Sequence, residues 1–191
     1  MIEPRERIEQ ESGRLGFDVV GFTRADVALE DDFDSYERFV AAGMHADMAY
    51  LADNAEVRRR LDGEGILPGA KTVICLATSY ARDDSGDDGL APDIARYARG
   101  RDYHGFLRKR LRRLAAFVRG LGDGVRARAL VDTAPVLERA WAARAGIGFI
   151  GKNGLLIVPG QGSYCLLGEV VTTLEIACAQ PSGRAAVGRP A

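Results

Sequence analysis

Several residue types that mark secreted and membrane proteins are scarce in this chain of 191 residues. It has three cysteines (Cys75, Cys165 and Cys178) without CxxC spacing, which argues against a disulfide framework and for reduced thiols in the cytoplasm. No apolar run approaches the roughly 20 residues that span a membrane, and the charged segment MIEPRERIEQESG is unlike a secretory signal peptide. We therefore expect a cytoplasmic monomer without a membrane partner.

The chain also has few residues that bind metals, and it has no net positive charge. The chain has two histidines, and no second His or Cys stands at ligand spacing, so its side chains are expected to bind no metal. The formal net charge of −1 gives no overall attraction to nucleic acid or to an anionic membrane. Since 47% of the residues are apolar and 28% are charged, the composition is that of an ordinary soluble globular domain.

Hydrophobic patterns predict helices and strands that alternate irregularly. Apolar residues at helical spacing indicate helices, and short apolar runs rich in β-branched residues indicate strands. The expected helices are 4–15, 33–42, 45–53, one beginning near Asp102, and 135–145; the expected strands are 17–22, 72–80, 125–131, 154–158 and 164–173. This order, with a hairpin across VPGQGSY, favours a layered α+β domain over 1–176, with a mixed sheet flanked by helices. Residues 177–191 lose this periodicity and are expected to form an irregular tail.

A lone aspartate, Asp132, separates the strand-like run VRARALV from the helical run that contains Pro135. One interpretation is a helix N-cap, whose side-chain oxygen accepts a hydrogen bond from a free amide of the first turn. The other is a carboxyl group sheltered at the end of a core strand, which holds a proton near neutral pH and acts as a general acid. Both stay open, because desolvation raises a carboxyl pKa whereas a helix N-terminus lowers it.

The loop GIGFIGKNG (146–154) is rich in glycine but matches neither common nucleotide motif. It lacks the GxGxxG spacing of a dinucleotide site, and Asn153 stands where the P-loop GxxxxGK[ST] has Ser or Thr. A nicotinamide or ATP site is therefore disfavoured. Two interpretations remain: a helix C-cap at Gly146 with a turn around Gly151, or a backbone that approaches a large ligand and presents Lys152 and Asn153 to it.

A basic stretch, RYARGRDYHGFLRKRLRRL (96–114), contains the start of the expected long helix, with Asp102 as its N-cap. His104, in the first turn, is either a polar surface or capping group or a residue that faces a ligand. Five of the six residues 108–113 are basic. Such a run is usual for a solvated helix face, and it is also what contact with an RNA phosphate backbone requires.

Four stretches, taken in order, resemble the N-terminal half of epoxyqueuosine reductase, a family that completes queuosine synthesis in tRNA. They are RLDGEGILPGAKTVICLATSY (60–80), RYARGRDYHGFLRKRLRRL (96–114), VDTAPVLERAWAARAGIGFIGKNGLLI (131–157) and GSYCLLGEVVTTLEI (162–176). The resemblance implies a cobalamin-binding catalytic domain over 1–176, with a layered α/β fold similar to reductive dehalogenases and nitroreductase-like proteins. It also implies the tRNA anticodon loop as substrate and reduction of epoxyqueuosine to queuosine as reaction.

The same resemblance implies roles for individual residues. Asp132 matches the family's proton donor, which protonates the epoxide oxygen that is lost as water. Seven further residues fall in segments that line the corrin or the tRNA nucleotide: Arg60, Tyr103, His104, Lys152, Asn153, Ser163 and Tyr164. Arg60 stands in RLDG, where RxDP is usual in the family, so Gly63 departs from the pattern.

The family continues into a ferredoxin-like region with two [4Fe–4S] clusters, each of which needs four thiolates. Three scattered cysteines cannot hold one such cluster, so the chain is expected to lack that domain and to depend on an electron donor outside it. Two alternatives to the enzyme stay open. One is a truncated corrinoid-binding module without turnover, and the other is a flavin-dependent nitroreductase-like enzyme, which rests on fold analogy alone.

Overall fold

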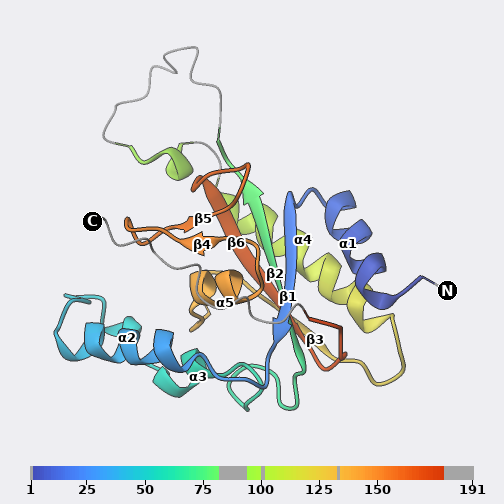
Figure 1. The fold of residues 1–191 in the computed structure, drawn as a ribbon, viewed down its shortest axis with the longest axis horizontal. Coiled ribbons are helices and arrows are strands. Elements are labelled where there is room, and N and C mark those ends of the chain that lie inside the picture. The colour runs from blue at the N-terminus through green and yellow to red at the C-terminus, as the bar shows by residue number, and fades with distance from the viewer. Residues whose placement is uncertain (1, 82–93, 100–101, 133, 179–191) are drawn as a thin grey trace, which may run out of the picture.

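A four-stranded sheet between two helical layers organises the molecule (Figure 1). The computed structural model describes residues 2–81, 94–99, 102–132 and 134–178. The strands are β1 (Val19–Arg24), β2 (Thr72–Ser79), β3 (Ala127–Leu130) and β6 (Cys165–Thr172), and their order in the sheet is β1-β2-β6-β3. The α+β class with a sheet flanked by helices is confirmed. The expected mixed pairing is corrected, because all three pairs of neighbouring strands in this sheet are antiparallel.

Strand β2 lies in the middle of the sheet and is buried on both faces. Successive side chains of a strand point to opposite sides, so Val73 and Cys75 face one helical layer while Ile74 and Leu76 face the other. An unbroken apolar run such as TVICLA suits this position, because neither face of the strand meets water. The strand predicted at 72–80 is therefore confirmed.

Helices α1 (Pro4–Arg14) and α4 (Tyr103–Arg119) cover one face of the sheet (Figure 1). The apolar stripe of α4 is fully buried at Leu107, Leu111 and Leu114, and it belongs to the same core cluster as Ile74. Asp102 caps this helix as expected: its Oδ1 accepts a hydrogen bond from the backbone N–H of His104 at 2.9 Å.

The opposite face is covered by α5 (Glu138–Arg144), whose Trp141 is fully buried against β2 and β6. Helices α2 (Glu30–Ala41) and α3 (Ala55–Arg59) and the single turns η1 (Ala49–Leu51) and η2 (Arg96–Ala98) complete the described helices. The C-cap predicted at Gly146 is confirmed. This glycine has a φ of 78°, and its N–H donates to the carbonyl of Ala143 while that of Ile147 donates to Ala142, a Schellman pairing.

The glycine-rich loop forms a two-stranded hairpin of β4 (Phe149–Ile150) and β5 (Leu156–Ile157). The turn predicted around Gly151 is confirmed, because the Gly154 N–H donates to the Gly151 carbonyl at 2.9 Å. The hairpin predicted across VPGQGSY is wrong, because β5 pairs with β4 whereas β6 belongs to the large sheet. This segment is a turn between the two sheets, closed by a bridge between Val158 and Gly162.

Two predicted helices differ from the structure, and one short helix was not predicted. The helix expected at 45–53 is a series of turns with the single turn η1, and the short helix α3 was not expected. Helix α5 begins at Glu138, three residues after the predicted start at 135. Residues 179–191 of the expected tail lie outside the described residues. In the part of the chain that is described, no helix is both long and apolar enough to cross a membrane.

Candidate active site

His104 joins two carboxylates at the start of α4. Its Nδ1 lies 2.6 Å from Oδ1 of Asp102, and its Nε2 lies 2.8 Å from Oδ2 of Asp132, which follows β3. Helix α4 packs directly on β3, so this packing brings together two predicted site residues that are 28 positions apart in sequence.

Both imidazole nitrogens of His104 face carboxylate oxygens, and a donating N–H suits both positions. The hydrogen bonds to Asp132 and to Asp102 raise the pKa of His104 above its ordinary value, while burial opposes this effect. The hydrogen bonds from His104 lower the pKa of Asp102. A protonated imidazole, with an N–H on each nitrogen, can donate to both carboxylates at once.

Tyr103 stacks on His104, with ring centroids 4.1 Å apart and 24° between the ring planes. Tyr97 of η2 meets the Tyr103 ring edge-on, at a centroid distance of 6.2 Å. Burial, with the nearby charges of Asp132 and Glu138, raises the pKa of Tyr103 to about 12. Its phenol therefore stays protonated at neutral pH, and the ring serves to fix the plane of the imidazole.

Asp132 is not a helix N-cap, and with a side chain that is 55% exposed it is not the sheltered carboxyl group of the other interpretation either. Helix α5 starts at Glu138, and Leu137 precedes it without a side-chain cap. Asp132 instead has a φ of 25°, and its N–H donates to Oε1 of Glu138 at 2.7 Å. A positive φ is costly for a residue with a Cβ atom. The Glu138 carboxyl group thus stabilises the strained backbone of Asp132, and the Asp132 side chain reaches His104.

Two partly or fully buried carboxyl groups near Asp132 were not predicted from the sequence. Burial raises the pKa of Glu138 to about 7, although the hydrogen bond from the Asp132 N–H acts in the opposite direction. Glu169 of β6 is fully buried, and neither of its carboxyl oxygens has a hydrogen-bond partner among the described residues. Burial, followed by the charge of Glu138, raises the pKa of Glu169 well above its ordinary value.

The sheet register explains how these groups meet. Glu169 lies opposite Leu130 on the neighbouring strand β3, two residues before Asp132. It also lies opposite Cys75 on β2, where burial and the charge of Glu169 raise the pKa of the thiol. The sequence signal for this group is a single carboxyl residue within the apolar run CLLGEVV.

The β4–β5 hairpin is tied to the first turn of α5. Arg139 donates through Nη1 to the carbonyl of Gly154 at the end of the hairpin turn. Lys152 and Asn153, both predicted site residues, lie exposed within this turn. Oδ1 of Asn153 accepts a hydrogen bond from the Leu155 N–H at 3.1 Å, so its side chain shapes the turn.

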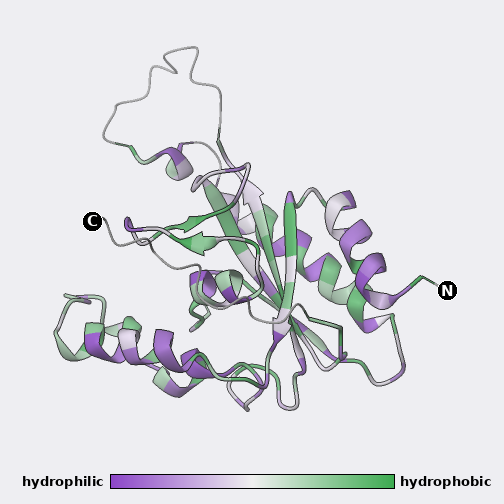
Figure 2. Cartoon of the chain, in the orientation of Figure 1, coloured by the Kyte–Doolittle hydropathy of each residue, from purple (hydrophilic) through white to green (hydrophobic). Residues whose placement is uncertain are grey.

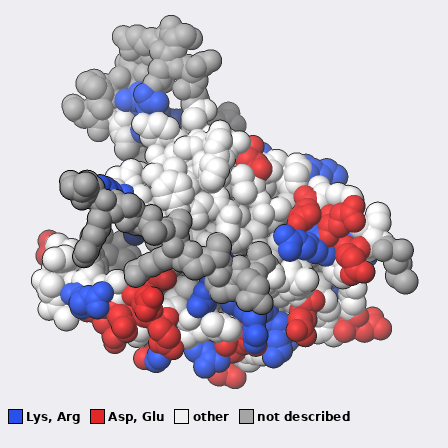
Figure 3. Space-filling view, viewed as in Figure 1, with Lys and Arg blue, Asp and Glu red and all other residues white. Residues whose placement is uncertain are grey.

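The hairpin presents large apolar side chains to solvent. The exposed fractions are 47% for Phe149, 38% for Ile150 and 44% for Leu155, and Figure 2 shows both strands as hydrophobic. In Figure 3, the visible surface over the upper ends of β2 and β6, beside the hairpin, carries few charged side chains. Large apolar side chains exposed close together in the chain make the hairpin a candidate for binding a ligand.

Ser163 and Tyr164 follow the turn that leaves the hairpin and precede β6. The Tyr164 ring meets Tyr80 edge-on at 5.5 Å, and the guanidinium of Arg96 lies 5.2 Å from its centre. Tyr164 nevertheless remains 42% exposed. Of these two predicted residues, Tyr164 thus presents a partly exposed ring between Tyr80 and Arg96.

Arg60 lies apart from the other predicted residues. Its guanidinium makes two hydrogen bonds to Asp62, of 3.0 and 2.8 Å, and the charges of Asp26 and Glu30 also act on it. Asp26 follows β1 at the end of the sheet where β2 begins, whereas Tyr164 precedes β6 at the end where β2 finishes. Figure 1 shows α3, which precedes Arg60, and the β4–β5 hairpin at opposite ends of the sheet.

Comparison with known proteins gives one consistent family. The family profile described as "Epoxyqueuosine reductase QueG, DUF1730" matches residues 60–133. The epoxyqueuosine reductase of Gloeobacter violaceus is 41% identical over 175 residues, which is 92% of this chain and 54% of that protein. That of a Synechococcus species is 44% identical over 146 residues, covering 76% of this chain and 44% of that protein.

Solved structures agree with the sequence comparison. The epoxyqueuosine reductase of Streptococcus thermophilus superposes with a TM-score of 0.82 at 33% identity, covering 93% of this chain and 48% of that chain. An epoxyqueuosine reductase with a tRNA-Tyr epoxyqueuosine-modified stem loop gives 0.80 at 28% identity, covering 97% and 49%. A reductive dehalogenase described with a mechanism for B12-dependent dehalogenation gives 0.57 at 18% identity, covering 96% and 21%, which shows a shared fold alone.

Proposed function

Because the chain belongs to the epoxyqueuosine reductase family and spans about half the length of the curated relatives it matches, we propose that it is a cobalamin-binding catalytic domain that reduces epoxyqueuosine to queuosine in tRNA. The observation that carries the proposal is the 2.8 Å contact between Nε2 of His104 and Oδ2 of Asp132. This contact supports the proposal, because it gives the residue that the family resemblance implies as the acid a neighbour that can carry a proton. The relative solved with an epoxyqueuosine-modified stem loop supports tRNA as the substrate.

The exposed side chains of the β4–β5 hairpin and of Tyr164 are of the chemical kind that binds a corrin. A corrin is a broad and largely apolar ring, and ligand sites for such groups are lined by apolar and aromatic side chains with a few polar groups. Phe149, Ile150 and Leu155 offer the apolar surface, Tyr164 an aromatic edge, and Lys152 a cation for the polar rim. When bound, the cobalamin supplies the redox chemistry, which protein side chains do not provide themselves.

Asp132 is the proton donor in this proposal. Removal of an epoxide oxygen as water consumes two electrons and two protons, and a positioned acid lowers the barrier by protonating the oxygen as the carbon–oxygen bond breaks. His104 returns a proton to Asp132 through their hydrogen bond. Asp102, on the other ring nitrogen, orients the imidazole and stabilises its protonated form.

Glu138 positions the acid. Its hydrogen bond to the Asp132 N–H holds the backbone at φ 25°, a conformation that directs the aspartate side chain toward His104. Glu169 is fully buried, and burial, followed by the charge of Glu138, raises its pKa well above the ordinary value. Burial therefore disfavours a second negative charge close to Glu138.

A second function, corrinoid binding without turnover, is favoured by the cysteine count. Cys75, Cys165 and Cys178 are free thiols, and three thiolates are too few for one four-cysteine cluster. If the chain is the enzyme, therefore, the electrons come from a donor outside residues 1–191.

Titration with cob(II)alamin, followed by absorption, tests the proposal. We expect saturable binding at micromolar concentrations; no binding by the folded protein, or a bound yellow flavin instead, contradicts the proposal. A strong chemical reductant then separates the two functions. Conversion of an epoxyqueuosine-containing stem loop supports the enzyme, and cobalamin binding without conversion supports the binding module.

A further inference from the structure

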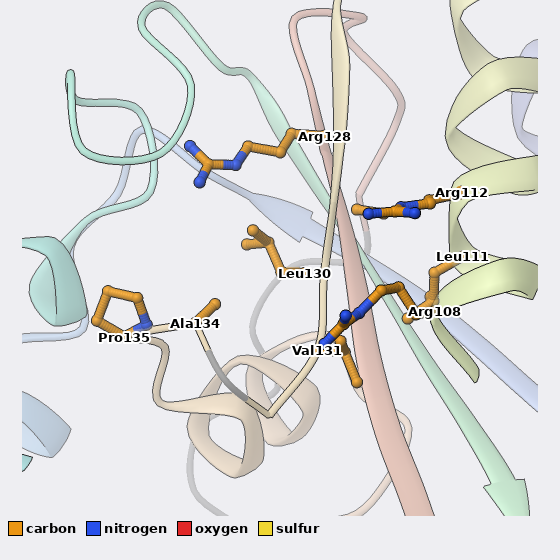
Figure 4. A pocket seen from close by; sticks show the side chains of 9 residues that line it. Arg108, Leu111, Arg112, Arg128, Leu130, Val131, Ala134 and Pro135 are labelled. Atoms are coloured by element: carbon orange, nitrogen blue, oxygen red, sulfur yellow. The ribbon is translucent and has the colours of Figure 1, made fainter. Parts of the chain in front are cut away.

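A cavity of about 230 Å³ opens at the edge of β3, next to the loop that carries Asp132 (Figure 4). Strand β3 is the last of its sheet and pairs with β6 on one side. The walls of the cavity come from α4, from β3 and from the segment that follows it, including Val131 and Pro135. Val131 directly precedes Asp132, and Asp132 itself is not among the described lining residues, so the cavity lies next to the loop of the proposed acid and not at its carboxyl group.

Three arginines line the cavity, and none of its described lining residues is acidic. Arg108 and Arg112 stand one turn apart on α4 and reach toward the strand, while Arg128 extends from β3 on the other side (Figure 4). All three are exposed. A guanidinium is permanently charged, and its planar fork matches the oxygens of a phosphate group. The cavity is therefore suited to an anion with phosphate chemistry.

The basic residues of α4 are not equivalent. Arg110 donates to the carbonyl of Gly16 at 3.1 Å and lies over the ring of Phe106, so it serves the protein's own packing. Lys109 and Arg113 are exposed and are not among the described residues that line the cavity. Only part of the run 108–113 thus belongs to this site.

Arg128 is held in place by the backbone. Its Nη1 donates to the carbonyls of Gly65 and Ile66, at 3.2 and 2.7 Å. A guanidinium fixed in this way loses less side-chain entropy when it binds a ligand. The sequence pattern does not single out Arg128, because its neighbours in VRARALV form a strand and not a basic run.

We infer that this cavity binds a backbone phosphate of the tRNA substrate, next to the nucleotide on which Asp132 acts. The inference rests on the proposed function, and it adds the cationic side chains that position the RNA. Arg108 and Arg112 contact the phosphate from α4, and Arg128 adds a third positive charge across the edge of β3. Free phosphate shares this chemistry and is distinguished by the test.

Matched charge removal on α4 tests the inference. Binding of an anticodon stem loop is measured by fluorescence anisotropy at several salt concentrations, for Arg108→Gln with Arg112→Gln and for the control Lys109→Gln with Arg113→Gln. Both pairs remove two charges from the same helix. We expect the cavity pair to weaken binding on the order of tenfold or more and to lower the salt slope by about one for each phosphate that the protein no longer neutralises. Equal losses in the two pairs, or no loss in either, overturn the inference.

Single methylphosphonate substitutions in the stem loop identify which phosphate binds in the cavity. They remove the charge from the RNA side, so the site can be tested without mutating Arg128, a change that would also break its hydrogen bonds to the backbone of residues 65–66. One neutral linkage should weaken binding to the wild-type protein and have no further effect on the Arg108→Gln, Arg112→Gln variant. Additive losses at every linkage contradict the assignment. Complete displacement of the stem loop by millimolar inorganic phosphate assigns the cavity to free phosphate instead.

The same variants are titrated with cob(II)alamin, so that this inference and the proposed function fail separately. If the Arg108→Gln, Arg112→Gln variant binds cobalamin and keeps its RNA affinity, the cavity assignment is wrong and the proposed function stands. Weakened RNA binding in a protein that takes up no cobalamin upholds the cavity and defeats the proposed function. Absence of stem-loop binding by the wild-type protein overturns the cavity assignment, whatever the cobalamin result.

Discussion

The backbone N–H of Asp132 donates to Oε1 of Glu138 at 2.7 Å, so the proposed acid is held by a second acid six residues later. The contact fixes a backbone with positive φ, and it brings a carboxyl group with a raised pKa close to the site of proton transfer. The ionisation of Glu138 therefore affects both the stability of the fold and the geometry of the site.

The first prediction concerns the pH dependence of stability in Glu138→Gln. The pKa of Glu138 is about 7 in the folded protein and has a reference value of 4.5, so the folded state holds an extra proton between these values. Linkage then requires the stability of the wild type to fall as pH rises through this window. The amide keeps an acceptor for the Asp132 N–H but does not titrate. Between about pH 4.5 and 7, the free energy of unfolding in urea should rise for the variant relative to the wild type. An equal pH dependence of the two free energies contradicts this prediction.

The second prediction is that Glu169→Met stabilises the protein. Glu169 is fully buried, and its carboxyl oxygens have no hydrogen-bond partner among the described residues. Removing an unsatisfied buried polar group relieves a penalty of about 1–3 kcal/mol. The matched control Glu175→Met replaces an exposed glutamate and should change the free energy of unfolding by less than about 0.5 kcal/mol. A destabilised Glu169→Met, measured by urea unfolding, would show that the Glu169 carboxyl group has a stabilising partner.

The third prediction concerns His104→Gln. Its hydrogen bonds to Asp132 and Asp102 raise the pKa of His104 in the folded state. The stabilisation is therefore fully present below the unfolded pKa of about 6.5 and disappears as pH rises through the higher folded pKa. The difference in unfolding free energy between wild type and variant should shrink across that range. His45→Gln, at the chain's other histidine, is the control, and an unchanging difference for His104→Gln argues against the protonated imidazole.

The fourth prediction is that an apolar residue of the hairpin contributes to cobalamin binding, whereas an exposed apolar residue elsewhere does not. Phe149→Ser should weaken cobalamin binding on the order of tenfold, since burying a phenylalanine side chain against a ligand contributes about 1.5–3 kcal/mol. The thermal midpoint should change little, because the side chain is 47% exposed. Met44→Ser, at a residue 68% exposed in the turn after α2, is the control. Equal cobalamin affinity in the two variants would remove the hairpin from the cofactor site.

Elements with a strong local pattern could be predicted from the sequence. The run 73–77 is apolar without interruption, and the leucines of 103–119 recur at helical spacing, so both elements are predicted correctly. The helix predicted at 45–53 was wrong because the apolar residues of this segment lie in turns instead of on one helical face. Helix α3 has five residues, too few to show a periodic pattern.

The site was predictable only in part. Asp132 and His104 came from the resemblance and from their chemistry, whereas their contact depends on α4 packing against β3. The sequence places Glu138 inside the helix predicted at 135–145, because Pro135 is typical of a helix start. In the structure the helix begins at Glu138, and the Glu138 side chain stabilises the loop before it. Glu169 meets this loop because of the strand register opposite Leu130, and no local signal encodes a register between strands so distant in sequence.

The most direct test of the central claim is single-turnover conversion of an epoxyqueuosine stem loop by cobalamin-loaded protein under a chemical reductant, comparing Asp132→Asn with Asp123→Asn. Asp123 is an exposed aspartate in the loop before β3. Loss of a general acid costs roughly a hundredfold to ten-thousandfold in rate, so Asp132→Asn should convert the substrate at least a hundredfold more slowly while binding cobalamin as tightly as wild type, and Asp123→Asn should match the wild type. Equal rates for the two variants would contradict the account.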